Sequence, residues 1–252
     1  MSIEDKIQGF NTAKRLPIVF CLDVSPSMGW KEGNNSSSME LLNAAVSNFI
    51  KELKQNRKTR SAAEIAFVTF STNIEMDTEF ESINTLKAPL FAPVDHGGTQ
   101  MAQAVLRSIE KIEQRKNQLV NSEIPYYAPF MVLVTDGNPD KNDNAVKYDH
   151  ALAQVKSHCY SHVGASEIIV PFIIGVGDHI DSETLNNYSK GFTKGYFPIR
   201  GNASKVQAKF NKVFHLISNS TLKSINLNGL YTETINTIQN DMNDLLADLA
   251  GE

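Results

Sequence analysis

The sequence predicts an α/β fold in which helices cover both faces of a mostly parallel β-sheet. Short apolar runs, rich in β-branched and aromatic residues, alternate along the chain with longer amphipathic stretches. The amphipathic stretches repeat apolar residues at three- and four-residue spacing, which is typical of helices packed on one side. Strands that alternate with helices of this length form βαβ units, and such units build parallel sheets.

Six apolar segments are predicted to be strands. In chain order they cover residues 18–22, 65–70, 74–80, 130–135, 168–176 and 196–199. The third alternates apolar and polar residues directly after a short turn, so we expect an antiparallel strand at the sheet edge. Pro171 lacks an amide hydrogen and should therefore lie at the start of its strand or on an unpaired side.

Apolar stripes predict helices around residues 42–53, 102–112, 152–159 and 206–217. We divide the chain into an N-terminal extension (1–14), one large domain (15–220) and a C-terminal amphipathic helical tail (221–252). The tail stripe spans only about two heptads, and an isolated helix of that length is marginal in water. Residues 230–250 should therefore dock on their own domain, on a second copy of the chain, or on a partner.

Composition excludes several classes of function. The net charge is -4 and no basic block stands out, so nucleic acid is a poor candidate partner. No apolar run is long enough to span a membrane, and the first residues do not resemble a signal peptide. Both cysteines, Cys21 and Cys159, lie in apolar patterns and are expected to be buried thiols. We therefore expect a cytoplasmic protein.

A group of oxygen-bearing side chains follows the first predicted strand. Asp23, Ser25 and Ser27 alternate along the chain, so in an extended segment their side chains point to one side. Asp136 follows the strand predicted to lie beside the first one, and Thr99 follows a pair of glycines at the start of a helix. Ligands of open α/β sheets bind at the carboxyl ends of the strands. Oxygen ligands of this kind suit a hard divalent cation such as Mg²⁺.

These motifs together resemble a known family. Asp23-Val-Ser-Pro-Ser27, Gly97-Gly-Thr99 and Thr135-Asp-Gly137 are similar, in sequence and in order, to the three parts of the metal-ion-dependent adhesion site of von Willebrand factor A (VWA) domains. The resemblance covers roughly residues 15 to 220. We accordingly expect a Rossmann-like sheet of order 3-2-1-4-5-6 with one antiparallel edge strand. Pro26 stands where the family often has a glycine, which stiffens the loop but removes no ligand.

The resemblance implies roles for these residues. Ser25, Ser27 and Thr99 would bind the metal through their hydroxyls, and Asp23 and Asp136 would bind it directly or through waters. The cation would be Mg²⁺, or else Mn²⁺ or Ca²⁺. Neutral hydroxyl ligands leave its charge poorly compensated, so the remaining position would favour an acidic group of a partner protein.

Two further residues are candidates for partner contact. Trp30 is the only tryptophan and lies just after the first motif. It either covers the core or serves as an exposed aromatic anchor. Asp140 lies in a polar loop on the same side of the sheet, where a solvated turn residue is the simpler interpretation.

We expect a binding module and not an enzyme. A metal-dependent phosphoesterase or phosphotransferase is the alternative, but Ser25 stands where an Asp-x-Asp pair would place its second acid, and no phosphate-binding glycine motif is present. A second alternative is a scaffold that acts through its C-terminal helix. A weaker similarity to bacterial tellurium-resistance-type VWA proteins suggests a cytosolic stress or signalling complex.

Overall fold

The computed structural model describes residues 14–31, 36–137, 145–160, 167–178, 180–226 and 231–251. Its strands and helices, in chain order, are β1 (Leu16–Asp23), η1 (Pro26–Gly29), α2 (Ser38–Gln55), α3 (Arg57–Ala62), β2 (Ala63–Phe70), β3 (Ile74–Asp77), β4 (Glu81–Ser82), α4 (Met101–Asn121), β5 (Phe130–Thr135), α5 (Ala145–Cys159), β6 (Val170–Val176), α6 (Ser182–Ser189), β7 (Phe197–Ile199), α7 (Ala203–Asn226) and α8 (Tyr231–Ala250).

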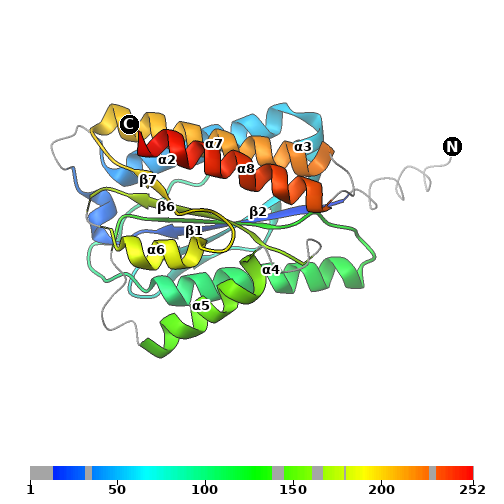
Figure 1. Cartoon of the computed structure of the whole chain (residues 1–252), viewed down its shortest axis with the longest axis horizontal. Coiled ribbons are helices and arrows are strands. Elements are labelled where there is room, and N and C mark those ends of the chain that lie inside the picture. Colours follow the sequence, from blue (N-terminus) through cyan, green and yellow to red (C-terminus); the bar gives the residue numbers. More distant parts are fainter. Residues whose placement is uncertain are drawn as a thin grey trace.

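A single sheet runs through the middle of the molecule, with helices above and below it (Figure 1). Its strand order is β3-β2-β1-β5-β6-β7, and β4 also pairs with β2. All pairs are parallel except those that join β2 to β3 and β4. The predicted order and the antiparallel edge are therefore confirmed. The predicted strand 74–80 is shorter than expected, because β3 ends at Asp77 and pairing resumes only in β4.

The central strand β1 explains why the sheet has two separate cores. All eight of its residues are buried. Leu16, Ile18, Phe20 and Leu22 point into the core beneath α2, α7 and α8, whereas Val19 and Cys21 point into the core above α4, α5 and α6. This alternation follows from the two-residue period of a strand, and Asp23 ends this buried strand at the carboxyl edge of the sheet.

Two sequence predictions about single residues hold in the sheet and its cores. Pro171 is the second residue of β6, before pairing with β7 begins at Ile174. Cys21 and Cys159 are both buried and free, and burial raises the pKa of the Cys21 thiol to about 12. No helix in the described ranges is long and apolar enough to cross a membrane.

The C-terminal stripe packs on its own domain. The first residues of the predicted tail, 221–226, form the end of α7, and α8 begins at Tyr231. In α8, Ile235, Ile238 and Met242 join the core formed with α2 and α7. Full burial of such a side chain contributes roughly 1.5–3 kcal/mol.

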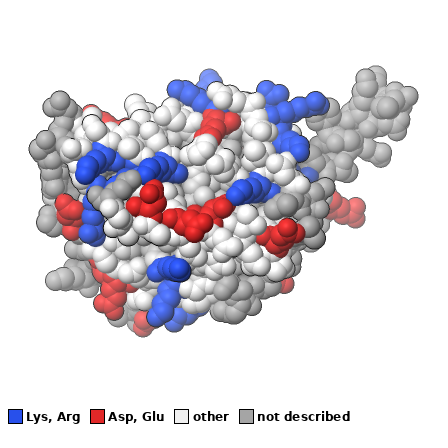
Figure 2. All heavy atoms as spheres, turned by 45° about the horizontal axis from the view of Figure 1, so that its top comes forward, with Lys and Arg blue, Asp and Glu red and all other residues white. Residues whose placement is uncertain are grey.

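Pairs of opposite charge hold the outer face of this helical layer. Lys212 of α7 pairs with Asp248 of α8 at 2.8 Å, and Lys223 pairs with Asp241. Figure 2 shows this side of the molecule, with basic and acidic side chains interspersed over it. The tail is thus part of the domain, and its apolar stripe is not free for a second copy or a partner.

Candidate metal and partner site

The loop after β1 is pinned from both sides. The Val24 amide donates to the carbonyl of Phe70 at 2.8 Å, and the Val24 carbonyl accepts from the Val94 amide at 2.8 Å. The chain then turns, because the Ser25 amide donates to Oδ1 of Asp23 at 2.8 Å. Pro26 occupies the start of the short helix η1, where its fixed φ is favourable. The turn brings the hydroxyls of Ser25 and Ser27 within 3.1 Å of each other.

The end of β5 supplies the second part of the site. Because β5 lies parallel to β1, with Leu22 opposite Val134, Asp136 emerges beside the first loop. The Ser27 hydroxyl donates to Oδ1 of Asp136 at 2.9 Å. The Thr135 hydroxyl donates to Oδ2 of Asp23 at 2.6 Å. Two segments far apart in sequence are thereby joined by side-chain hydrogen bonds.

Thr99 arrives from a third segment. The turn before α4 is fixed to the turn after β2, since the Gly98 amide donates to the Thr72 hydroxyl at 2.7 Å and the Gln100 amide to the Ser71 carbonyl at 2.7 Å. Gly97 must lack a side chain, because a Cβ there would lie 2.2 Å from the Ser71 hydroxyl. The sequence prediction that paired glycines allow this sharp turn has a steric basis here.

Gly137 shows how close the three segments come. A Cβ added at Gly137 would lie 3.1 Å from Oγ1 of Thr99 and 3.7 Å from Oδ2 of Asp23. The absence of that carbon keeps a space between these oxygens. The structure thus brings together Asp23, Ser25, Ser27, Thr99 and Asp136, the five residues expected to bind a metal.

Sequence reasoning did not assign a role to Thr135. It is fully buried and holds the carboxylate of Asp23 through the hydrogen bond described above. Its hydroxyl also accepts from the Gly137 amide at 3.2 Å. A threonine as the last residue of a buried strand, directly before an acid, was the available signal.

Asp23 is a buried carboxylate surrounded by neutral groups. Its exposed fraction is 0%, and burial raises the pKa of its carboxyl group, an effect that hydrogen bonds from Thr135 and Ser25 oppose. Among the described residues, no Lys or Arg forms an ion pair with it. A buried carboxylate without a cation is costly, because hydrogen bonds replace only part of its hydration.

The donor set fits a hard divalent cation. It comprises two carboxylates and three hydroxyls, all oxygen donors, which is the chemistry that Mg²⁺ prefers. Within the described residues, no group of three or more His, Cys, Asp or Glu side chains could hold a metal ion. That the five residues bind a metal stays a prediction.

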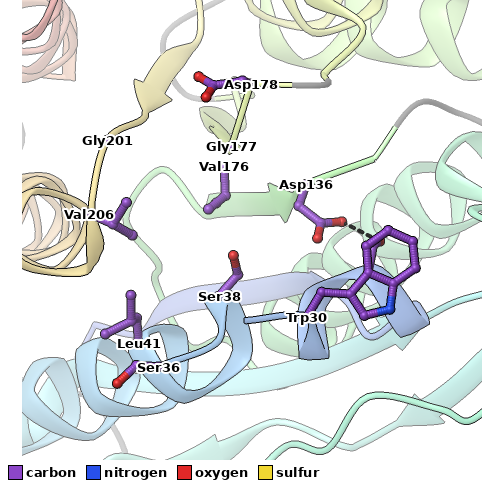
Figure 3. A pocket seen from close by; sticks show the side chains of 11 residues that line it. Trp30, Ser36, Ser38, Leu41, Asp136, Val176, Gly177, Asp178, Gly201 and Val206 are labelled. Atoms are coloured by element: carbon purple, nitrogen blue, oxygen red, sulfur yellow. Dashed lines mark hydrogen bonds between the residues drawn. The ribbon is translucent and has the colours of Figure 1, made fainter. Parts of the chain in front are cut away.

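The two candidate partner residues differ in what can be said of them. The side chain of Trp30 is 62% exposed, so the alternative that it covers the core is wrong. It stands at the rim of a pocket of about 200 Å³ that also includes Ser27 and Asp136 (Figure 3). Asp140 lies outside the described residues.

Solved structures with this fold include proteins of bacterial pili. The PilB minor pilin from Streptococcus sanguinis superposes with a TM-score of 0.55 at 14% identity, covering 86% of this chain and 64% of that one. The pilus adhesin SpaC from Lactobacillus rhamnosus GG gives a TM-score of 0.56 at 13% identity, covering 84% and 31%. A von Willebrand factor type A protein from Catenulispora acidiphila gives 0.52 at 12%, covering 84% and 43%. The chain thus spans less than two thirds of each neighbour.

Sequence comparison gives a family but no close relative. No curated protein matches the chain at a significant level. The family model of the von Willebrand factor type A domain matches residues 18–212, which include all three loops of the site and all seven strands except the first two residues of β1. The chain therefore belongs to the von Willebrand factor type A domain family.

Proposed function

We propose that this protein is a metal-dependent binding module, in which a divalent cation, Mg²⁺ by preference, links the domain to an acidic group of a partner protein. The observation that carries the proposal is the convergence of five oxygen-bearing side chains from three separate loops at the carboxyl edge of the sheet. The von Willebrand factor type A domain is a module that commonly mediates protein–protein interaction.

Each residue has a definite task in this proposal. Ser25, Ser27 and Thr99 offer neutral hydroxyl oxygens, while Asp23 and Asp136 supply negative charge directly or through water. When bound, the cation would supply a positive charge, and because its three hydroxyl ligands are neutral, its open position favours an anionic oxygen from outside. The Ser25 amide and the Thr135 hydroxyl orient the Asp23 carboxylate by donating hydrogen bonds to its two oxygens.

Magnesium titration of single-residue variants tests the metal site. Calorimetry should show one Mg²⁺ or Mn²⁺ site in the wild-type protein, abolished in Asp23→Ala and weakened at least tenfold in Thr99→Ala. Ser71→Ala is the matched control, because the Ser71 hydroxyl is buried, adjacent and without a hydrogen-bond partner among the described residues. Unchanged affinity in both Asp23→Ala and Thr99→Ala would refute the assignment.

An acidic probe tests the partner chemistry. A capped peptide with one Glu should bind in Mg²⁺, should not bind in EDTA, and should lose binding when Glu is replaced by Gln. Equal binding of the Glu and Gln peptides in Mg²⁺ would show that the carboxylate is not what the site recognises.

We propose no chemical reaction for this site. Ser25 stands where a phosphoesterase with an Asp-x-Asp pair would place its second acid, and the Ser25 and Ser27 hydroxyls are engaged with each other and with Asp136. Metal-dependent hydrolysis of a generic phosphate ester, lost in Asp23→Ala, would overturn this part of the proposal.

The cellular setting is a further part of the proposal. We place the protein in a bacterial cytosolic stress or signalling complex, supported by two cysteines that are both free thiols, as is usual in reducing compartments. The pilus proteins among the structural neighbours share the fold at 14% and 13% identity, which carries no information about location. Localisation of a tagged full-length protein in its native host tests this.

A further inference from the structure

The pocket beside the metal site has walls from four separate parts of the chain. It shares Ser27 and Asp136 with the candidate metal site, and it extends from there between the start of α2 and the end of β6 (Figure 3). Val206, in the first turn of α7, closes the far end. A side chain next to the metal-bound acidic group of a partner could therefore enter it.

The pocket combines carboxylates with an exposed aromatic ring. Asp136 lies on one side and Asp178 above, while the indole of Trp30 stands at the mouth beside Asp136 (Figure 3). Among the described residues that line the pocket, none is a Lys or an Arg. Carboxylates and the face of an indole both attract cations.

Asp178 is only weakly compensated. The nearest cation with which it pairs is Arg200, whose Nε lies 4.0 Å from Oδ1, and the Asp178 side chain is 77% exposed. Arg200 also donates to the Tyr196 hydroxyl at 3.1 Å, so its charge is shared with a second acceptor. A cation from a partner could approach Asp178 from inside the pocket.

Two positive features of the walls oppose a cation but are weaker. The helices α2 and α7 both begin at the pocket, and a helix start carries about half a positive charge. The start of α2 is neutralised by its capping box, in which Ser37 and Glu40 bond each other's backbone amides, and Asn202 accepts from the Lys205 amide at α7. Arg200, Lys205 and Lys209 line the adjoining hollow that shares Asp178 and Gly201 with the pocket. The charged side chains among the described residues that line the pocket itself are the two carboxylates, Asp136 and Asp178.

A bound divalent ion does not reverse this balance. Its two positive charges are opposed by Asp23, Asp136 and the carboxylate of the partner, which leaves one net negative charge before Asp178 is counted. At the far end, Val176 and Val206 are 1% and 6% exposed, so little apolar surface is left to cover. That surface suits the methylene groups of a lysine or arginine better than a bulky apolar side chain.

We propose that this pocket, formed by Trp30, Asp136, Asp178 and Val206, binds a cationic side chain of the partner. The inference rests on the proposed function, because the cationic residue belongs to the same segment as the acidic residue that reaches the metal. The partner is thus recognised by a neighbouring acid and base, and not by an acid alone.

Trp30 provides a direct readout, because it is the only tryptophan in the chain. Two capped peptides, acetyl-Glu-Gly-Lys-amide and acetyl-Glu-Gly-norleucine-amide, are titrated in Mg²⁺ while the emission of Trp30 is followed. The lysine peptide should bind about three to five times more tightly, the gain expected for one ion pair with a cation–π contact at a partly exposed site.

Charge-neutral variants separate the pocket from general electrostatics. Asp178→Asn should remove the preference for lysine, and Arg200→Gln should increase it. Glu75→Gln removes the same charge on β3, at the opposite edge of the sheet, and should leave the preference unchanged. Equal affinities of the two peptides in the wild type, or a preference that survives Asp178→Asn, would overturn the inference.

A metal-free experiment distinguishes failure of the pocket inference from failure of the proposed function. In EDTA, acetyl-lysine methylamide should change the emission of Trp30 at millimolar concentration, and acetyl-norleucine methylamide should not. If the lysine compound acts while neither peptide depends on Mg²⁺, the pocket is right and the metal proposal is wrong. If the lysine compound has no effect beyond that of norleucine, the pocket assignment is wrong.

Discussion

Two buried acids of this domain are stabilised in opposite ways. Glu64, on β2, is 5% exposed and accepts two hydrogen bonds from the guanidinium of Arg115, at 2.6 and 2.7 Å. Asp23, at the end of the neighbouring strand β1, is held by hydroxyl and amide groups alone. Glu64 thus has a counterion within the chain, whereas the charge of Asp23 is not compensated by a cation among the described residues. The contrast supports the proposal that the carboxyl edge of the sheet takes up a cation that the chain itself does not supply.

The largest expected change in the free energy of unfolding is at the ion pair between Glu64 and Arg115. Arg115→Met should lower the free energy of unfolding by about 3 kcal/mol, because it leaves Glu64 buried and unpaired. Chemical denaturation measures the loss. The double variant Arg115→Met/Glu64→Leu is the control and should recover most of it. A single variant as stable as the wild type would show that Glu64 rehydrates easily, and the contrast with Asp23 would then disappear.

At Asp23, the free energy of unfolding should depend on bound metal much more than on removal of the carboxylate charge. Saturation with Mg²⁺ at a hundred times its Kd should raise the free energy of unfolding by about 2.7 kcal/mol in the wild type. Asp23→Asn should change the metal-free stability by less than about 1 kcal/mol, because it removes a buried charge while keeping an oxygen for the Ser25 amide. The metal-dependent gain should be absent in this variant. Equal gains in both proteins would contradict the comparison.

The sheet edge offers an intermediate case at Asp77. Partial burial raises the pKa of its carboxyl group, but hydrogen bonds from Lys111 and Arg107 outweigh burial and hold the pKa below its ordinary value. A pKa that is lower in the folded state contributes stability above the unfolded value, near pH 4, and this contribution is lost as the pH falls through the folded pKa.

Replacing Asp77 tests this predicted pH dependence of stability. Asp77→Asn should be about 1 kcal/mol less stable than the wild type at pH 7. The difference should shrink steadily below about pH 4, as followed by urea denaturation at several pH values. A difference that grows in acid would mean that the ion pairs do not control the pKa of Asp77.

The smallest effect on stability is expected at Trp30. Because its side chain is mostly exposed, Trp30→Ser should change the free energy of unfolding by no more than about 0.5 kcal/mol. Thermal unfolding measures this. A loss of 2 kcal/mol or more would show that the ring supports the fold and is not simply presented at the rim of the pocket.

The sheet was predictable because its signals are local. Each buried strand is a continuous apolar run, and the alternation with helices implies parallel pairing. The strand order was expected from the resemblance to the von Willebrand factor A domains. The five oxygen donors were predictable because each stands at the end of a recognisable element. The exact end of β3 was missed, since pairing geometry decides it and not composition.

The remaining parts of the site could not be predicted from local pattern. Thr135 reaches Asp23 only because β5 lies beside β1. Asp178 lines the pocket only because the end of β6 lies near the start of α2. Such contacts join residues more than a hundred positions apart, and a single sequence contains no periodic signal for them. The proposed partner pocket is therefore a product of the assembled fold, whereas the proposed metal ligands can be found in the sequence alone.

The way α8 is used sets a practical limit on shortened versions of this protein. Its stripe contributes Ile238, Met242 and Leu249 to the same core as α2 and α7. A fragment that stops at Asn226 would expose an apolar surface on α7 and should aggregate at the concentrations that interaction assays need. Binding lost in such a fragment would thus report on colloidal behaviour, and full-length protein is the appropriate bait.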